Sequence, residues 1–153
     1  MTPELLAELA RLPLFPRTAL ELMRIAGTDA TAALIAAWPG QEFPVPLLGG
    51  RKSPLGMRRF DQLAEIVGAE AAREIVKHWG GQKLSIPNLK EVRWQSRQQQ
   101  IRSEYDLLTA GGYSHPEAVF ELGIAHGVTG RAIELVLKRP DAIPVDAAQG
   151  RLF

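Results

Sequence analysis

The chain of 153 residues is long enough for one domain of ordinary size or two small ones, and a hydrophobic content of 46% can bury a core. Its 18 basic and 17 acidic residues give a net charge of +1, so no global field attracts nucleic acid or an anionic membrane. The absence of cysteine excludes disulfides, thiolate nucleophiles and cysteine-containing zinc sites, and it fits a reducing compartment.

The first residues, MTPELLAELARLPLF, contain Glu4 and Glu8 and lack both a basic leader and an unbroken apolar run. This pattern is not that of a secretory signal or a membrane span. We therefore expect a soluble cytoplasmic protein without a membrane partner.

An internal repeat follows. Residues 22–46 align with residues 63–87 without a gap, at the shift of 41 residues that separates Trp38 from Trp79. Composition alone does not place Trp, Gly, Gln and Pro at a common spacing, so we interpret the match as a duplication rather than a coincidence between two alanine-rich stretches. The identical pairs are Leu22 and Leu63, Ile25 and Ile66, Gly27 and Gly68, Ala30 and Ala71, Trp38 and Trp79, Gly40 and Gly81, Gln41 and Gln82, and Pro46 and Pro87.

Each copy predicts two helices that meet at a glycine. Gly27 and Gly68 can end the first helix in a left-handed conformation. The second helix then begins at Thr28 or Ala69, with an acidic residue at its positive end.

A short strand is predicted to follow the second helix of each copy, because apolar residues alternate there. They are Phe43 and Val45 in the first copy and Leu84 and Ile86 in the second. Pro44 removes a ladder donor, so the first strand should pair on only one edge or be broken. One unit of about 25 residues cannot cover its own apolar face. We expect the copies to pack as a pseudo-dimer with a two-stranded ribbon.

These patterns predict a mainly α-helical fold with boundaries that follow the repeat. The duplicated domain spans residues 1–88, with copies at about 18–47 and 59–88. Residues 48–58 form a basic linker that either touches phosphates or only solubilises the chain. A helix-turn-helix domain spans residues 89–139, and an irregular tail spans 140–153.

The helix-turn-helix prediction starts from a polar, then helical segment after Pro87. Its apolar face would contain Ile101, Tyr105, Leu107 and Leu108. Gly111 and Gly112 end it, and Ser114 with Glu117 then has the spacing of a capping box for the next helix.

The turn between the last two helices carries three expected signals. Gly123 is a small residue at the helix crossing, Gly127 can adopt a positive φ, and Thr129 can cap the final helix. Apolar contacts between the helices would come from Leu122, Val128, Ile133 and Val136. Glycine turns between helices are common, so the pattern alone is moderately specific.

The stretch VKHWGGQKLSIP, followed by a polar segment, a helix and HGVTGRAIELVLKR, resembles the Mor transcription activator family of Mu-like phages. The resemblance rests on Gly80, Gly81, Gln82, Ile86 and Pro87 and on the Gly-Val-Thr turn at Gly127, Val128 and Thr129. It implies a helical dimerisation unit, a DNA-binding helix-turn-helix, and activation of phage promoters in a bacterial host through contact with RNA polymerase. The chain departs from the family by an extra copy of the dimerisation unit and by a last helix without a basic run.

We therefore expect a sequence-specific regulator, an activator of phage or prophage origin, whose partners are double-stranded DNA and RNA polymerase. The helix at about 129–139 would enter the major groove. Its base-reading face would contain Thr129, Gly130, Arg131, Glu134 and Leu135. Phosphates would be held by Lys90, Arg93, Arg97, Arg102, Lys138 and Arg139. The chain would act as a homodimer, or as a monomer with an intrachain pseudo-dimer.

An enzyme is not expected. His78, His115 and His126 have no metal-ligand spacing, and phosphate-loop and dinucleotide fingerprints are absent. We expect no cofactor, metal or catalytic residue. The alternative function is a protein-interaction or virion-associated module, which the neutral charge of residues 113–139 and an exposed Leu135 favour.

Overall fold

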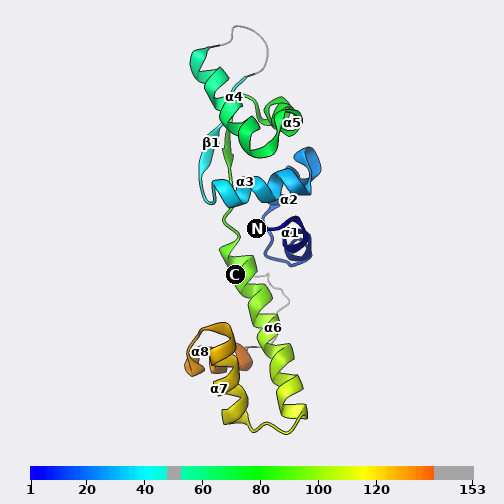
Figure 1. Ribbon diagram of the computed structural model, residues 1–153, viewed down its shortest axis with the longest axis vertical. Helices are drawn as coiled ribbons and strands as arrows, with labels where there is room; N and C mark the ends of the chain where they lie inside the picture. Colours follow the sequence, from blue (N-terminus) through cyan, green and yellow to red (C-terminus); the bar gives the residue numbers. More distant parts are fainter. Residues whose placement is uncertain (48–52, 140–153) are drawn as a thin grey trace. The chain divides into compact units, whose positions relative to one another are not determined.

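A computed structural model describes residues 1–47 and 53–139 of the chain. The chain divides into two units, Met1–Lys90 and the part from Glu91 onward. Helices dominate, and the described residues contain one antiparallel ribbon of two strands, as Figure 1 shows. The prediction of a mainly helical fold with a small ribbon is confirmed at that level. None of the described helices has the length and apolar character that a membrane crossing requires.

The first unit contains two helical pairs, each followed by a strand. Its elements are α1 (Pro3–Leu9), α2 (Arg17–Ala26), α3 (Thr28–Ala37), β1 (Glu42–Pro44), α4 (Pro54–Val67), α5 (Ala69–Trp79) and β2 (Lys83–Ser85). The pair α2 and α3 precedes β1, and the pair α4 and α5 precedes β2. The order of elements is therefore the one that the repeat predicts for each copy.

Each helical pair bends at a glycine with positive φ. Gly27 has φ 92° and ψ 162°, and Gly68 has φ 92° and ψ 155°. A Cβ atom strongly disfavours this region, so both bends require glycine. The predicted helix starts at Thr28 and Ala69 are confirmed. The glycines, however, adopt an extended positive-φ conformation rather than the left-handed helical one.

The ribbon pairs residues that match under the repeat. Phe43 lies opposite Leu84, which is its equivalent at the shift of 41 residues. The flanking backbone bonds also form matched pairs. They run from Gly40 N to Ile86 O and Gly81 N to Val45 O, both 2.9 Å, and from Val45 N to Gln82 O at 2.9 Å and Ile86 N to Gln41 O at 2.8 Å. Exchanging the two segments leaves this pattern unchanged, as expected around a local twofold axis.

Pro44 faces the unpaired edge of the ribbon. In β1, the amide of Val45 donates toward β2, and amides of adjacent residues point in opposite directions along a strand. The ring nitrogen of Pro44 therefore points away from β2. The prediction that this strand pairs on only one edge is confirmed.

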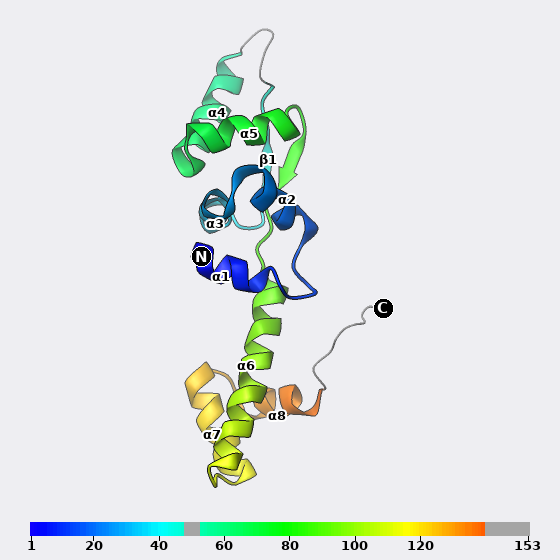
Figure 2. The same ribbon diagram turned by 90° about the vertical axis from the view of Figure 1, so that its right-hand side faces the viewer.

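The core of the first unit is built from matched residues. α2 packs against α5, and α3 packs against α4. Leu22 and its equivalent Leu63 are fully buried, as are Leu34 and its equivalent Ile75. The apolar face of each pair is thus covered by the other pair (Figure 2).

Helix α1 was not predicted. Thr2 caps it by accepting from the amide of Leu5 at 3.1 Å. Leu6 and Leu9 are buried, and the helix packs on α3. The sequence signal was short, at seven residues, and the helix is stabilised by this tertiary contact.

The prediction of a basic linker over residues 48–58 is wrong for residues 54–58, which lie in α4. Ser53 caps α4 by accepting from the amide of Gly56 at 2.9 Å, and Pro54 occupies the first turn. Arg58 therefore lies in a helix. Residues 48–52 of that prediction, and the predicted tail 140–153, lie outside the described residues.

The second unit contains α6 (Lys90–Ala110, whose first residue belongs to the first unit), α7 (His115–His126) and α8 (Gly130–Lys138). Its core is formed by Ile101, Leu122, Ile133 and Val136. Tyr105 and Leu108 pack against this core, as predicted, but Leu107 is 74% exposed. Leu107 points away from this core, because consecutive residues of an α-helix are rotated by about 100° around its axis.

Candidate nucleic-acid interface

Helices α7 and α8 form a hairpin, the α7–α8 hairpin, with a cap at each helix start. Ser114 accepts from the amide of Glu117 at 3.3 Å, and the Glu117 carboxylate accepts from the amide of Ser114 at 3.0 Å. Thr129 accepts from the amide of Ala132 at 3.1 Å. Both predicted caps are confirmed, so the start of each helix is determined locally.

The turn brings the two helices into close contact. Gly127 is left-handed, with φ 65° and ψ 34°. A Cβ atom placed on Gly123 would lie 3.0 Å from the carbonyl oxygen of Val128. The absence of a side chain at Gly123 thus permits the approach, as the sequence predicted, and the buried Leu122, Ile133 and Val136 join the helices.

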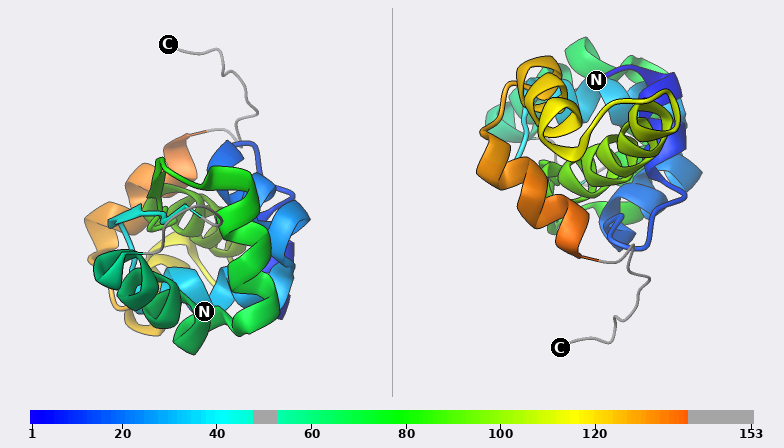
Figure 3. Two further views of the ribbon diagram at one scale, coloured as in Figure 1. Left: turned by 90° about the horizontal axis from the view of Figure 1, so that it is seen from above. Right: turned by 90° about the horizontal axis from the view of Figure 1, so that it is seen from below.

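Helix α8 presents a basic and apolar face to solvent. Arg131, Leu135 and Lys138 are spaced by four and three residues, which places them on one side of the helix. All three are exposed, and Leu135 retains 47% of its accessible surface. α8 crosses α6 steeply, and Figures 2 and 3 show its outer side clear of α6 and α7.

The five predicted base-reading residues are all exposed, but their roles within the hairpin differ. The hydroxyl of Thr129 accepts the capping bond. Glu134 Oε1 lies 2.7 Å from His115 Nε2, and His115 Nδ1 lies 2.8 Å from the Tyr105 hydroxyl. Glu134 is therefore tied to the start of α7, at the margin of the face that contains Arg131.

Two of the predicted phosphate ligands bind helix ends. Arg97 Nη1 donates to the carbonyl of His126, the last residue of α7, at 3.3 Å. Arg102 Nε donates to the carbonyls of Val136 and Arg139 at 3.3 and 3.1 Å. A cation at the negative end of a helix stabilises it, so these guanidinium groups join α6 to both helices of the hairpin.

The other predicted phosphate ligands are exposed. Arg93 lies in the early turns of α6, and Lys138 and Arg139 lie at the end of α8. Lys90 is also exposed, at the first position of α6, but it belongs to the first unit. Among the predicted phosphate ligands of the second unit, Arg102, Lys138 and Arg139 lie together at the end of α8.

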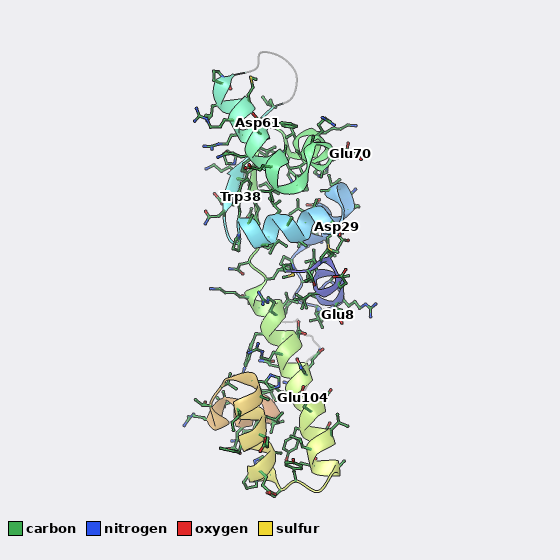
Figure 4. All side chains as sticks on the ribbon, in the orientation of Figure 1. Glu8, Asp29, Trp38, Asp61, Glu70 and Glu104 are labelled. Atoms are coloured by element: carbon green, nitrogen blue, oxygen red, sulfur yellow. The ribbon has the colours of Figure 1, made fainter. Side chains whose placement is uncertain are left out.

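A buried histidine contact was missed by the sequence analysis. His126 Nε2 lies 2.8 Å from Glu104 Oε1, and the His126 side chain is only 8% exposed. Glu104 lies on α6 beside the hairpin (Figure 4). Its place three residues after Ile101 was the available signal, because this spacing puts it on the packing face of α6.

Hydrogen bonds lower the pKa of two carboxyl groups in the second unit. The bond with His126 is the main cause for Glu104, and Gln100, whose Nε2 donates at 2.9 Å, adds to it. The backbone amide of Ser114 is the main cause of the lowered pKa of Glu117. Both carboxylates therefore stabilise the hairpin in their ionised form.

Metal-ligating side chains are not clustered in the described residues. No group of three His, Cys, Asp or Glu side chains there could hold a metal ion. His115 and His126 each contact one carboxylate and join helices. These contacts hold α6, α7 and α8 together.

A helical hairpin with a tight glycine turn and an exposed second helix is a geometry that regulatory DNA-binding proteins use. The chain belongs to the Mor transcription activator family, whose model matches residues 51–152. This is a regulatory, non-enzymatic family of phage transcription activators. The match contains α4 to α8 and leaves the first helical pair outside. No curated protein and no solved structure matches the chain significantly.

Proposed function

We propose that the protein is a phage or prophage transcription activator that binds double-stranded DNA through the α7–α8 hairpin, acting as a helix-turn-helix with α8 in the major groove. The observation that carries the proposal is the exposed face of α8. Arg131 and Lys138 flank Leu135 there, while the opposite face is buried in the core. Membership of an activator family supports the same role.

Base contacts would centre on the first two turns of α8. Arg131 can donate two hydrogen bonds to guanine, and Leu135 can contact a thymine methyl group. Gly130 allows close approach of the helix start, while the Thr129 hydroxyl can still donate a bond. Glu134 would act at the edge of this surface, because it is engaged with His115.

Phosphate contacts would come from the cations at the edges of the hairpin. Lys138, Arg139 and Arg93 are exposed. A guanidinium group has five N–H donors, so Arg97 can position the hairpin and contact phosphate together. Arg102, which donates to the carbonyls at the end of α8, is proposed as a phosphate ligand at that position. Lys90 is exposed at the first position of α6 and completes the predicted set.

The first unit would be a duplicated dimerisation domain, with residues 1–88 acting as a pseudo-dimer and residues 89–139 as the DNA-binding domain. The reciprocal ribbon bonds and the matched core leucines support this interpretation. Helix α6 would begin the DNA-binding domain. RNA polymerase is the expected second partner, as activation requires.

Fluorescence anisotropy with promoter DNA from the phage's own genome, at low salt, tests the proposal. We expect Arg131→Ala to weaken specific binding by about 1 to 3 kcal/mol. Arg24→Ala is the matched control, because Arg24 is exposed on α2, outside the family match. Absence of binding at tens of micromolar protein, a concentration within the range of about 10⁻⁴ to 10⁻⁶ M that is typical of nonspecific dissociation constants even at physiological salt, would refute DNA binding.

A protein-interaction module is the second candidate, favoured by exposed apolar side chains on α7. Phe120 and Ile124 are one helical turn apart and are 65% and 64% exposed. If Arg131→Ala and Arg97→Ala leave activity unchanged while Phe120→Asp or Leu135→Asp abolishes it in a folded chain, this function replaces DNA binding. Retention of a protein partner from nuclease-treated lysate would support it only alongside that pattern.

A further inference from the structure

The two helical pairs of the first unit already serve as each other's partner. The residue at the centre of the ribbon, Phe43, lies opposite its own equivalent, Leu84. In a homodimer built on a twofold axis, one residue meets the same residue of another chain. Here the second surface comes from the same chain, so the symmetric interface is satisfied internally.

The core leaves little apolar surface at the matched positions for another copy. Leu22, Leu34, Leu63 and Ile75 are all fully buried within the unit. An isologous interface needs such residues to be exposed before association. The matched apolar positions that would join two chains are therefore already buried between the two helical pairs of one chain.

The ribbon is also poorly suited to adding a strand from another molecule. Pro44 has no amide donor, and it points to the outer edge of β1. On β2, Lys83 is exposed. Proline and lysine at strand edges are the devices by which proteins prevent edge-to-edge pairing.

The internal symmetry ends after the ribbon. β2 is followed by α6 and the α7–α8 hairpin, whereas the stretch after β1 leads to α4. The described residues therefore contain one α7–α8 hairpin for two copies of the dimerisation unit. A homodimer with one copy per chain would present two such hairpins.

We infer that the chain closes its dimerisation surface on itself and presents a single recognition hairpin, so that it binds one asymmetric half-site rather than an inverted repeat. The DNA part of this inference rests on the proposed function. Dimeric helix-turn-helix proteins bind two half-sites about one helical turn apart, and linkage of two heads raises their affinity. A chain that presents one hairpin lacks that gain in affinity.

The mass of the full chain tests the closed surface without DNA. Light scattering after size exclusion should give the monomer mass of 16.8 kDa across the accessible concentration range. A tagged chain mixed and refolded with untagged chain should not retain the untagged copy. A dimer mass, or retention of the untagged copy, overturns the inference.

Selection of DNA duplexes from a random-sequence pool by the full chain tests whether a single α7–α8 hairpin binds DNA. We expect a non-palindromic motif, and a duplex with two inverted copies about 10 base pairs apart should bind no more than about twofold better than one copy. An inverted-repeat motif, or a gain of about 10²-fold, overturns the inference. If no DNA is enriched, the DNA-binding proposal fails, and the mass measurement alone decides whether the dimerisation surface is closed.

Discussion

The first and second helical pairs have the same backbone plan but different surfaces. Both bend at a glycine, at Gly27 or Gly68, and both bury a leucine of the first helix completely. They differ on the outer side of the second helix. In α3, Ala32 is covered, and α1 packs on that helix, whereas its equivalent in α5 is the exposed Arg73. The shared positions thus belong to the bend and the interface, whereas the matched positions of Ala32 and Arg73 differ in burial, and α3 is the helix on which α1 packs.

The largest effect should come from the matched core leucines. Leu22→Ala and Leu63→Ala each remove a fully buried side chain, so each should lower the free energy of unfolding by about 2 to 5 kcal/mol. Urea unfolding followed by circular dichroism measures both. Similar losses would support equal contributions of the two pairs, while a harmless Leu22→Ala would show that the first pair is an appendage.

The surface difference predicts an asymmetric pair of substitutions. Ala32→Arg places a long charged side chain at a position that is 2% exposed, and should destabilise the chain by about 1 to 3 kcal/mol. The reverse change at the equivalent site, Arg73→Ala, should alter stability by less than about 0.5 kcal/mol. Thermal unfolding of the two variants checks this. Equal effects would mean that α1 does not protect α3.

The bends predict a smaller, symmetric loss. Gly27→Ala and Gly68→Ala each place a Cβ atom at φ 92°, and each should cost about 1 to 2 kcal/mol. No atom lies within 4 Å of the added Cβ at either site, so the cost is conformational rather than steric. Unfolding midpoints measure it. A neutral result at one bend only would place the copies under different constraints.

The smallest effect concerns the hairpin, which depends on polar contacts with α6. The pKa of Glu104 is lowered in the folded chain, so its contribution is present above its ordinary pKa of 4.5 and is lost as pH falls through the folded value. Glu104→Gln should therefore lower the free energy of unfolding by about 0.5 kcal/mol or less near neutral pH, because solvent screens the partly exposed Glu104 carboxylate. The difference from the unmodified chain should shrink toward pH 3 in urea unfolding. A constant difference would contradict an ionised role.

Local signals in the sequence were sufficient for much of the architecture. The caps at Ser114 and Thr129 and the left-handed Gly127 depend on residues within about four positions, and these predictions were confirmed. Gly27 and Gly68 have positive φ as expected, but their backbone is extended rather than left-handed helical. The prediction that β1 pairs on only one edge also followed from one residue, because Pro44 has no amide donor. The sequence resemblance to the Mor family was confirmed by the family match.

Tertiary structure alone decided which exposed-looking polar residues are engaged. Arg97 and Arg102 bind carbonyls 29 to 37 positions away, and Glu134 meets His115 across the hairpin. Helix α1 likewise depends on a surface of α3 that forms only after folding. Spacing within one helix predicts which side chains share a face, but a bond between helices depends on how they cross. For that reason the bends and caps were determined by the sequence, and the partners of the site residues were determined by the fold.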